Sequence, residues 1–190
     1  NFLEKNEINF YTGVPDSLLK DFCAYIEDNF NSKKHIIAAN EGASIGLAIG
    51  YYLSSGKLPL VYLQNSGLGN AINPLISLAS PEVYSIPLLL IIGWRGEPGV
   101  KDEPQHIHQG RITPALLNTM GIPYIVIDSD TVEDDILMKV GKQIILSKSK
   151  KQPVCLLIRK GTFNSYNKKS KNSKHLEYKL EREKAVEIAV

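Results

Sequence analysis

Short hydrophobic runs alternate along this chain with segments in which hydrophobic residues recur at helical spacing. The runs predict strands within residues 8–14, 35–39, 58–64, 86–94, 123–128 and 153–161. The periodic segments predict helices over residues 17–30, 41–53, 71–79, 111–120 and 131–147. Strands that alternate with helices build parallel sheets. We therefore predict an α/β fold with a doubly wound, about six-stranded parallel sheet and helices on both faces.

Two polar stretches interrupt this alternation. Residues 95–110, RGEPGVKDEPQHIHQG, mix both signs of charge without a period and predict a functional loop. Residues 128–131, DSDT, predict a cap for the following helix through Ser129 or Asp130.

The last part of the chain changes in composition. Residues 164–174 are rich in Ser, Asn and Lys and predict a mobile linker, and residues 177–190, EYKLEREKAVEIAV, begin another helical pattern. A helix with no strand behind it is typical of a chain that continues. We therefore divide the sequence into one domain over 1–163 and, over 164–190, a linker and the start of a helix leading to a second domain that the sequence lacks.

Composition narrows the class of protein. The 190 residues are 43% hydrophobic and 22% charged with a net charge of +2, so bulk charge indicates neither a nucleic acid nor a membrane surface as partner. The longest hydrophobic run, 86–93, is too short to span a bilayer, and no signal peptide is recognised. Cys23 and Cys155 lie far apart in hydrophobic patterns, which favours two free thiols in a reducing cytoplasm.

Polar, mostly glycine-bearing turns follow the first four predicted strands. They are TGVPDS at 12–17, NEG at 40–42, QNSGLGN at 64–70 and GWRGEPGVKDEPQH at 93–106. The carboxyl ends of parallel strands share one edge of a sheet, and ligands bind there in open α/β folds. The sequence therefore predicts a site at this edge.

Glu41 is the single charged residue in a stretch that otherwise carries no charge until Lys57. A carboxylate in the first turn of a helix is favoured by the helix dipole alone, which is one interpretation. The other is a proton-sharing group that faces a flat ring. Gly46 and Gly50 each cost the helix up to about 1 kcal/mol relative to Ala, so we expect close packing there to compensate.

The turn at 64–70 resembles a dinucleotide fingerprint only superficially, because it lacks the third glycine at the required spacing. Asn65, Ser66 and the backbone amides of residues 67–70 predict a small polar cradle at a helix N-terminus, which suits an anion.

The polar stretch after the fourth strand carries basic and imidazole side chains. These are Arg95, Lys101, His106, His108 and, just beyond, Arg111. They favour recognition of a small multiply charged anion together with proton transfer, although a merely solvated loop remains an alternative. His106 and His108 have no third ligand at a suitable spacing, so no metal site is predicted. Trp94 is either a core residue or a stacking wall.

Three segments resemble one known family. GVPDS at 13–17, residues 39–75 (ANEGASIGLAIG to AINPL) and residues 87–110 (PLLLIIGWRGEPGVKDEPQHIHQG) resemble the N-terminal, pyrimidine-binding domain of the phosphonopyruvate decarboxylases. These are thiamine diphosphate enzymes, and the alpha subunit of sulfopyruvate decarboxylase is a close relative. The resemblance runs from about Phe10 to Gly161. The NEG signature belongs to the wider superfamily, whereas GWRGEPGVKDEPQH is much narrower.

The resemblance implies decarboxylation of 3-phosphonopyruvate to phosphonoacetaldehyde and CO2, in phosphonate biosynthesis. It implies that Glu41 hydrogen-bonds N1′ of the cofactor's aminopyrimidine and favours its 4′-imino tautomer. Its other implied residues fall into three groups: Asp16 and His106 for proton transfer; Asn65, Gly67 and Leu68 around the pyrimidine; Arg95, Lys101, Arg111 and His108 for the substrate anion. The alternatives are a sulfopyruvate decarboxylase alpha subunit and a non-catalytic binding domain.

One motif of the family does not occur. Its second domain holds Mg²⁺ and the cofactor's diphosphate with a Gly-Asp-Gly motif, and these 190 residues contain no such motif. The resemblance therefore implies that this chain alone is inactive and that thiamine diphosphate and Mg²⁺ are held mainly by the missing domain. It further implies a homodimer or higher oligomer with the active site at the interface.

Overall fold

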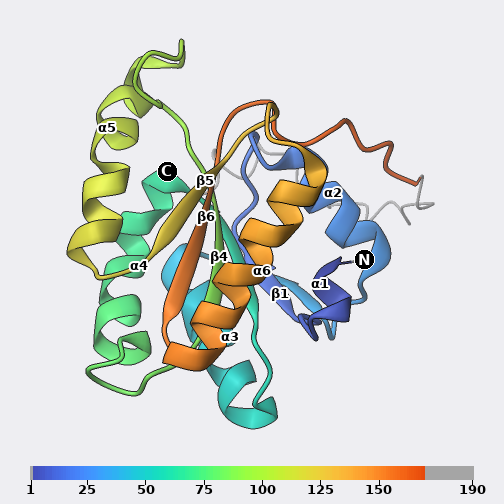
Figure 1. Ribbon diagram of the computed structural model, residues 1–190, viewed down its shortest axis with the longest axis vertical. Helices are drawn as coiled ribbons and strands as arrows, with labels where there is room; N and C mark the ends of the chain where they lie inside the picture. The colour runs from blue at the N-terminus through green and yellow to red at the C-terminus, as the bar shows by residue number, and fades with distance from the viewer. Residues whose placement is uncertain (1, 170–190) are drawn as a thin grey trace, which may run out of the picture.

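The strands form one sheet in which every adjacent pair is parallel. The computed structural model describes residues 2–169. Its strands are β1 (Tyr11–Gly13), β2 (His35–Ile37), β3 (Leu60–Gln64), β4 (Leu88–Gly93), β5 (Tyr124–Ile127) and β6 (Pro153–Ile158). They lie in the order β2-β1-β3-β4-β6-β5 (Figure 1). The predicted six-stranded parallel α/β fold is confirmed.

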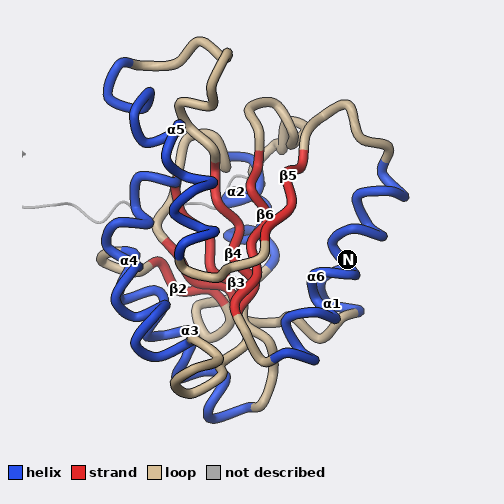
Figure 2. Tube along the Cα trace, turned by 60° about the vertical axis from the view of Figure 1, so that its left-hand side comes forward, coloured by secondary structure: helices blue, strands red, loops and turns tan. Residues whose placement is uncertain are grey.

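Helices cover both faces of the sheet. They are α1 (Phe2–Lys5), α2 (Lys20–Asn29), α3 (Glu41–Ser55), α4 (Leu68–Pro74), α5 (Pro104–Thr119) and α6 (Glu133–Lys150), with a 3₁₀ turn at Asn65–Gly67 and a π turn at Leu75–Ala79. In Figure 2, α3, α4 and α5 lie on one side of the strands, and α1 and α6 lie on the other. Helix α2 packs in the layer of α6, because Phe22 and Ile26 share a core cluster with Val140 and Ile144.

The core divides into two layers because successive strand residues point to opposite faces. In β4, Leu89 and Ile91 pack toward α2 and α6. Leu88, Leu90 and Ile92 pack toward α3, α4 and α5. All six residues of β4 are buried, as expected for a central strand covered on both faces. Burying each such aliphatic side chain stabilises the fold by roughly 1.5–3 kcal/mol.

The predicted loop at 95–110 is wrong in its second half. Helix α5 begins at Pro104 instead of residue 111, so His106 and His108 are helical. Proline suits the first turn of a helix because its missing N–H has no partner to lose there. The first turns of α5 are mostly exposed, with Ile107 at 49%, so no hydrophobic period marked them in the sequence.

Smaller differences concern turns. The stretch predicted as a glycine-rich turn at 65–70 is already helical, as the 3₁₀ turn and the start of α4. Neither Ser129 nor Asp130 caps α6. Instead Asp128 Oδ1 accepts hydrogen bonds from the backbone N–H groups of Asp130 and Thr131 and from the Thr131 hydroxyl. Helix α1 was not predicted.

Residues 164–169, predicted as the start of a linker, run along α2. The Tyr166 N–H donates to Asp21 Oδ1 at 2.9 Å, and Lys168 Nζ pairs with Glu27 Oε2 at 2.7 Å. The helix expected at the end of the sequence lies outside the described residues.

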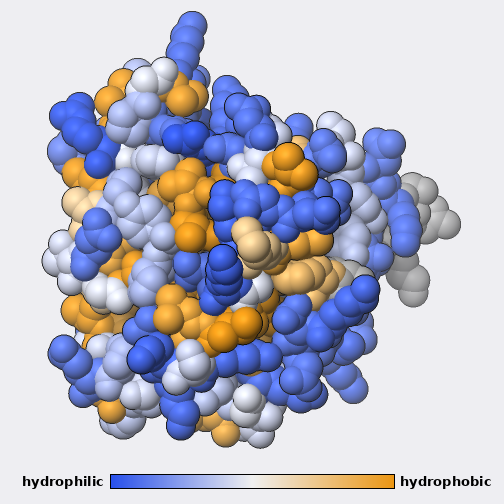
Figure 3. All heavy atoms as spheres, viewed as in Figure 1, coloured by the Kyte–Doolittle hydropathy of each residue, from blue (hydrophilic) through white to orange (hydrophobic). Residues whose placement is uncertain are grey.

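Both cysteines are free, Cys155 buried and Cys23 half-buried. Within residues 2–169, no helix has the length and hydrophobicity needed to cross a membrane. Figure 3 shows hydrophobic side chains interspersed with hydrophilic ones on the side that carries α6, where Met138 and Ile145 are exposed.

Candidate functional site

The site lies where the strand order changes direction. From β1 the chain crosses to β2 on one side, and β3 then pairs with β1 on its other side. Because all strands are parallel, the turn after β1, the start of α3, the 3₁₀ turn after β3 and the loop after β4 meet at one edge. Such a switch point is where open α/β sheets bind ligands.

Glu41 begins α3 and lies over Gly67. Asn40 caps the helix, since its Oδ1 accepts from the Ala43 N–H at 2.8 Å. The Asn70 side chain donates to Glu41 Oε2 at 2.9 Å. A Cβ on Gly67 would lie 2.4 Å from Glu41 Oε1, so a larger residue here would displace the carboxylate from this position. The structure thus brings Glu41 and Gly67 together and adds Asn70, which the sequence reasoning had left unassigned inside QNSGLGN.

Asn65 and Leu68 lie beneath this surface. Leu68 is fully buried in the hydrophobic core against α3 and β4 residues. Asn65 is 1% exposed; its Oδ1 accepts from the Arg95 N–H at 3.1 Å, and its Nδ2 donates to the Arg95 carbonyl and to Thr113 Oγ1. Its amide is therefore fully used within the chain, and it joins the end of β3 to the loop after β4 and to α5.

Asp16 follows β1 and is 6% exposed. Neither of its carboxylate oxygens has a hydrogen-bond partner among the described residues. Burial raises the pKa of this carboxyl; the positive charge of Arg95, and backbone amides of residues 17–19 that miss hydrogen-bond geometry, offset this only in part. A Cβ on Gly93 would lie 2.3 Å from Asp16 Oδ2, so the end of β4 leaves room for the acid.

The Arg95 guanidinium forms an ion pair with Asp102 and is not exposed as a free cation. Its Nε donates to Asp102 Oδ2 at 2.8 Å, and its Nη2 reaches Oδ1 at 2.5 Å. Its Nη1 donates to Ser17 Oγ at 2.8 Å, next to Asp16. The Arg95 guanidinium holds the pKa of Asp102 well below its usual range.

The remaining basic candidates separate into two places. Lys101 and Arg111 line one cavity of about 430 Å³, together with residues 96–100 and Ile107. His106 and His108 are two positions apart on α5, which places them on roughly opposite sides of the helix. His106 is half-buried beside Gly96, and His108 is exposed. Trp94 packs at the edge of the core and donates from Nε1 to the Gly110 carbonyl at 2.8 Å.

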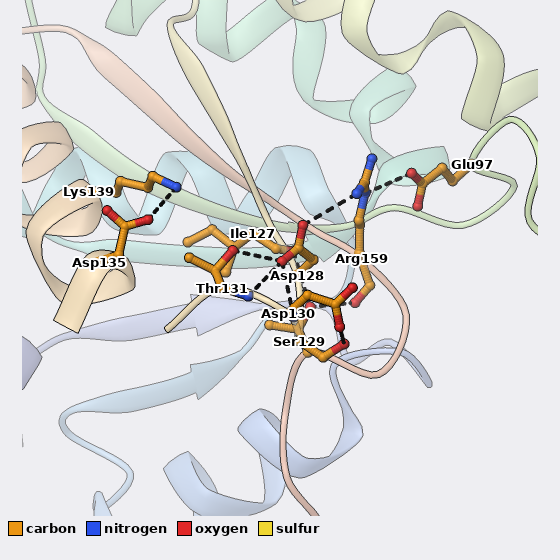
Figure 4. Close-up of polar contacts among 10 residues, drawn as sticks. Glu97, Ile127, Asp128, Ser129, Asp130, Thr131, Asp135, Lys139 and Arg159 are labelled. Carbon is orange, nitrogen blue, oxygen red and sulfur yellow. Dashed lines mark hydrogen bonds and ion pairs between the residues drawn. The ribbon is translucent and has the colours of Figure 1, made fainter. Parts of the chain in front are cut away.

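A second set of ion pairs, centred on Arg159, also holds the loop after β4 (Figure 4). The sequence did not suggest it. Arg159, after β6, pairs with Glu97 at 2.7 Å and with Asp128 at 3.3 Å. The Thr131 hydroxyl donates to Asp128 at 2.7 Å, and this hydrogen bond is the main cause that lowers the pKa of Asp128. The network joins the loops that follow β4, β5 and β6.

The residues present fit one half of a thiamine diphosphate site. The Glu41 carboxylate lies across Gly67, and Gly42 packs against the Asn70 carbonyl, where a Cβ would come within 2.8 Å. This leaves a polar, side-chain-poor surface beside one acid, which suits the edge of a flat heterocycle. No cluster of three or more His, Cys, Asp or Glu side chains that could hold a metal ion occurs in residues 2–169.

Solved structures define the class of fold. A thiamine diphosphate-dependent 4-hydroxybenzoylformate decarboxylase from Rhodococcus jostii superposes with a TM-score of 0.63 over 87% of this chain and 30% of that one, at 21% identity. Benzoylformate decarboxylase from Polynucleobacter necessarius gives 0.61 over 90% of this chain and 30% of that one, at 18% identity. The fold is that of one domain of the thiamine diphosphate enzymes.

Residues 1–117 match the family described as "Thiamine pyrophosphate enzyme, N-terminal TPP binding domain", and the chain belongs to it. Sulfopyruvate decarboxylase subunit alpha of Methanococcus maripaludis is 37% identical over 151 residues, 80% of this chain and 86% of that protein. Phosphonopyruvate decarboxylase of Streptomyces viridochromogenes is 39% identical over 117 residues, 58% of this chain and 29% of that protein.

The resemblance stated from the sequence is thereby confirmed, and the thiamine cofactor with it. The chain spans most of the sulfopyruvate decarboxylase subunit but under a third of the phosphonopyruvate decarboxylase, so it covers one domain of the longer relative. Both relatives are named as decarboxylases.

Proposed function

We propose that this chain supplies the pyrimidine-binding part of a thiamine diphosphate-dependent decarboxylase that converts 3-phosphonopyruvate to phosphonoacetaldehyde and CO2. The observation that carries the proposal is the Glu41 carboxylate at the head of α3, lying over Gly67 with one oxygen bonded to Asn70. Its other oxygen, Oε1, has no hydrogen-bond partner among the described residues.

Glu41 holds a proton at N1′ of the aminopyrimidine, while Gly67 makes room for the Glu41 side chain and Gly42 for the Asn70 carbonyl. Bound thiamine diphosphate supplies the electron sink that accepts the charge left when CO2 departs. The Asn70 amide fixes Glu41 Oε2, so the unpartnered Oε1 is the oxygen free to share the proton. Mg²⁺ and the diphosphate belong to a second domain outside this chain.

Two further groups are proposed for proton transfer. The Asp16 carboxyl is buried without a hydrogen-bond partner among the described residues, and burial raises its pKa, which favours a group that holds and releases a proton. His106 lies at the start of α5 beside the same loop. We propose no joint role for His106 and His108, because two positions two residues apart lie on roughly opposite sides of α5.

Lys101 and Arg111 are the proposed ligands of the phosphonate. Both are exposed cations that line one cavity of about 430 Å³. Arg111 lies one helical turn after Ile107 on the same side of α5, so the helix and the loop form opposite walls. A tetrahedral anion is bound well by two cations that approach from different sides.

A second copy of the chain is proposed to cover the outer face of α3. This face carries no charge and exposes small and apolar residues: Ala43, Gly46, Leu47, Gly50 and Leu53. Leu53 is 70% exposed, and a Cβ on Gly46 or Gly50 would meet nothing within 4 Å. The close packing expected at these glycines is therefore not found among residues 2–169, and we assign it to a partner. The face continues directly from Glu41, which fits an active site completed between subunits.

Sulfopyruvate is the second candidate substrate. The sulfopyruvate decarboxylase subunit matches this chain over 86% of its own length, whereas the phosphonopyruvate decarboxylase match covers 29%. Sulfonate and phosphonate are both tetrahedral anions, and the same two cations suit either. The cytoplasm is the proposed location, since Cys23 and Cys155 are both free thiols.

The test uses the complete enzyme, with the diphosphate-binding partner domain or subunit, and both keto acids. We expect kcat/KM to be higher for phosphonopyruvate, and a preference for sulfopyruvate would select the second candidate. Glu41→Gln removes the proton-sharing carboxylate but keeps its shape. It should lower kcat at least about a hundredfold while thiamine diphosphate still binds, as followed by fluorescence titration. A variant with near-normal kcat would exclude Glu41 from the mechanism.

A further inference from the structure

The Arg95 side chain joins the start of the loop after β4 to its end. It reaches from the end of β4 to Asp102, seven residues later in the chain, and both contacts to that carboxylate come from one planar guanidinium. Asp102 also accepts from the N–H groups of Gly96 and Glu103, each at 2.8 Å. Asp102 therefore receives four hydrogen bonds, and bidentate charged pairs of this kind are the strong ones.

The backbone of Arg95 is fixed as firmly as its side chain. Asn65 accepts from its N–H at 3.1 Å and donates to its carbonyl at 2.8 Å. With the base of the residue held by Asn65 and its end by Asp102, Arg95 has no freedom to swing toward a substrate. Reaching one would require breaking the Asp102 pair and leaving a half-buried carboxylate without its cation, which is costly.

The contact that remains points to the turn after β1. Arg95 Nη1 donates to Ser17 Oγ at 2.8 Å, and the preceding residue is Asp16, whose carboxylate oxygens have no hydrogen-bond partner in residues 2–169. Among the charges near Asp16, Arg95 has the largest effect favouring the ionised carboxyl. Ser17 and Asp16 line a cavity of about 360 Å³, whose other titratable groups are Lys20, Cys23, Glu27, His35, Tyr62 and Lys168.

Several of those neighbours are already paired. Lys168 Nζ lies 2.7 Å from Glu27 Oε2, and His35 Nε2 lies 2.7 Å from the Tyr62 hydroxyl. Burial raises the pKa of Cys23 to about 11, so this thiol adds no charge near neutral pH.

We propose that Arg95 is a positioning residue: held by Asp102, it fixes the turn that carries Asp16 and balances the charge of the Asp16 carboxyl during proton transfer, instead of binding the substrate's anion. This inference rests on the proposed decarboxylase function. It reassigns Arg95 from the substrate group and leaves Lys101 and Arg111 to hold the phosphonate.

The test compares Arg95→Gln, Arg95→Lys and Asp102→Asn with the wild type in the complete enzyme. Arg95→Gln should lower kcat about tenfold or more with less than about threefold change in KM, because the loss falls on proton transfer. The limb of the kcat–pH profile governed by Asp16 should move to higher pH, since the opposing charge is gone. Arg95→Lys keeps the charge and should return that limb toward its original position. A rise in KM at unchanged kcat and unchanged pH profile would overturn the proposal.

Asp102→Asn provides the second arm. Because Asp102 acts through Arg95, the double variant Arg95→Gln/Asp102→Asn should be no slower than Arg95→Gln alone, whereas independent roles would multiply the two losses. Asp135→Asn, which removes one partner of an exposed ion pair with Lys139 on α6, is the matched control and should leave kcat unchanged.

A readout without substrate separates this inference from the proposed function. Infrared titration of the protonated carboxyl band, with Asp16→Asn subtracted, reports Asp16 ionisation directly in the complete enzyme. Its midpoint should rise in Arg95→Gln. A raised midpoint in an enzyme that decarboxylates neither keto acid would end the proposed function alone, and an unmoved midpoint in an active enzyme would end the positioning role alone.

Discussion

At the scale of single residues, the buried Asp16 carboxylate lowers the free energy of unfolding. A buried carboxylate whose oxygens lack hydrogen-bond partners is costly in its charged form. We predict that Asp16→Asn raises the free energy of unfolding of this chain by about 1 kcal/mol near neutral pH, as measured by urea denaturation. The same change should lower kcat in the complete enzyme, as stability and activity oppose each other at such sites.

The direction of the Asp16 pKa shift determines how the stability gain of Asp16→Asn changes with pH. Burial raises the pKa of Asp16 in the folded chain above the unfolded value of about 3.9, so the folded state binds the proton more tightly. Its contribution to stability is present in full below that pH and is lost as the pH rises through the folded pKa. The gain in Asp16→Asn should therefore grow on raising the pH from about 4. Glu82→Gln, at an exposed acid, is the control; an equal gain there would contradict the explanation.

Residue-level features were predictable where a strand end and a helix start are adjacent in the chain. The position of Glu41 followed from a hydrophobic run and the helical segment after it, and the structure places it accordingly, with Asn40 as the cap. The contact between Asn65 and Arg95 was not predictable in this way. The two residues lie 30 positions apart along the chain and meet only because β3 pairs with β4. Polar residues at a sheet edge look alike in sequence whether they face a ligand or each other.

At the scale of elements, the loop after β4 and helix α5 are joined backbone to backbone. A Cβ on Gly110 would lie 1.7 Å from the Gly96 carbonyl oxygen, and Gly96 itself has φ +68. We predict that Gly110→Ala destabilises the chain by about 3 kcal/mol or more, since neither backbone can give way, as measured by thermal unfolding.

Gly141→Ala in α6 is the matched control for that change. Its new methyl group would meet the Phe2 ring at an ordinary 3.7 Å, so the chain should be unchanged or slightly more stable. Equal losses in both variants would mean that the contact between Gly96 and Gly110 is not the cause.

Element boundaries were least predictable where an element is exposed. Strands β4 and β6 are buried throughout, so continuous hydrophobic runs marked them well. The first half of α5 carries proline, histidines and a glycine that packs on another backbone, and none of these gives a hydrophobic period. The hydrophobic pattern reports burial, so it gives no signal where a helix is held by backbone contacts, as α5 is at Gly96.

At the scale of the whole molecule, two variants on the outer face of α3 test whether a second copy of the chain covers that face. Gly46→Ala and Gly50→Ala add methyl groups that meet nothing within 4 Å in the described part of the chain. Each should stabilise the isolated chain by up to about 1 kcal/mol through helix propensity. If another subunit packs closely on this face, the same variants should weaken assembly of the complete enzyme at least tenfold, as measured by sedimentation. Stabilisation with assembly unaffected would remove α3 from the interface.

The order of the strands also bears on how the chain is made. Strand β6 separates β4 from β5 in space yet is the last of the three to be synthesised. In a chain that lacks β6, β4 has one unpaired edge and β5 has no neighbouring strand among the described strands. Bare edges of hydrophobic strands invite pairing with other chains. We therefore expect a chain that ends before residue 153 to aggregate more readily than one that includes β6.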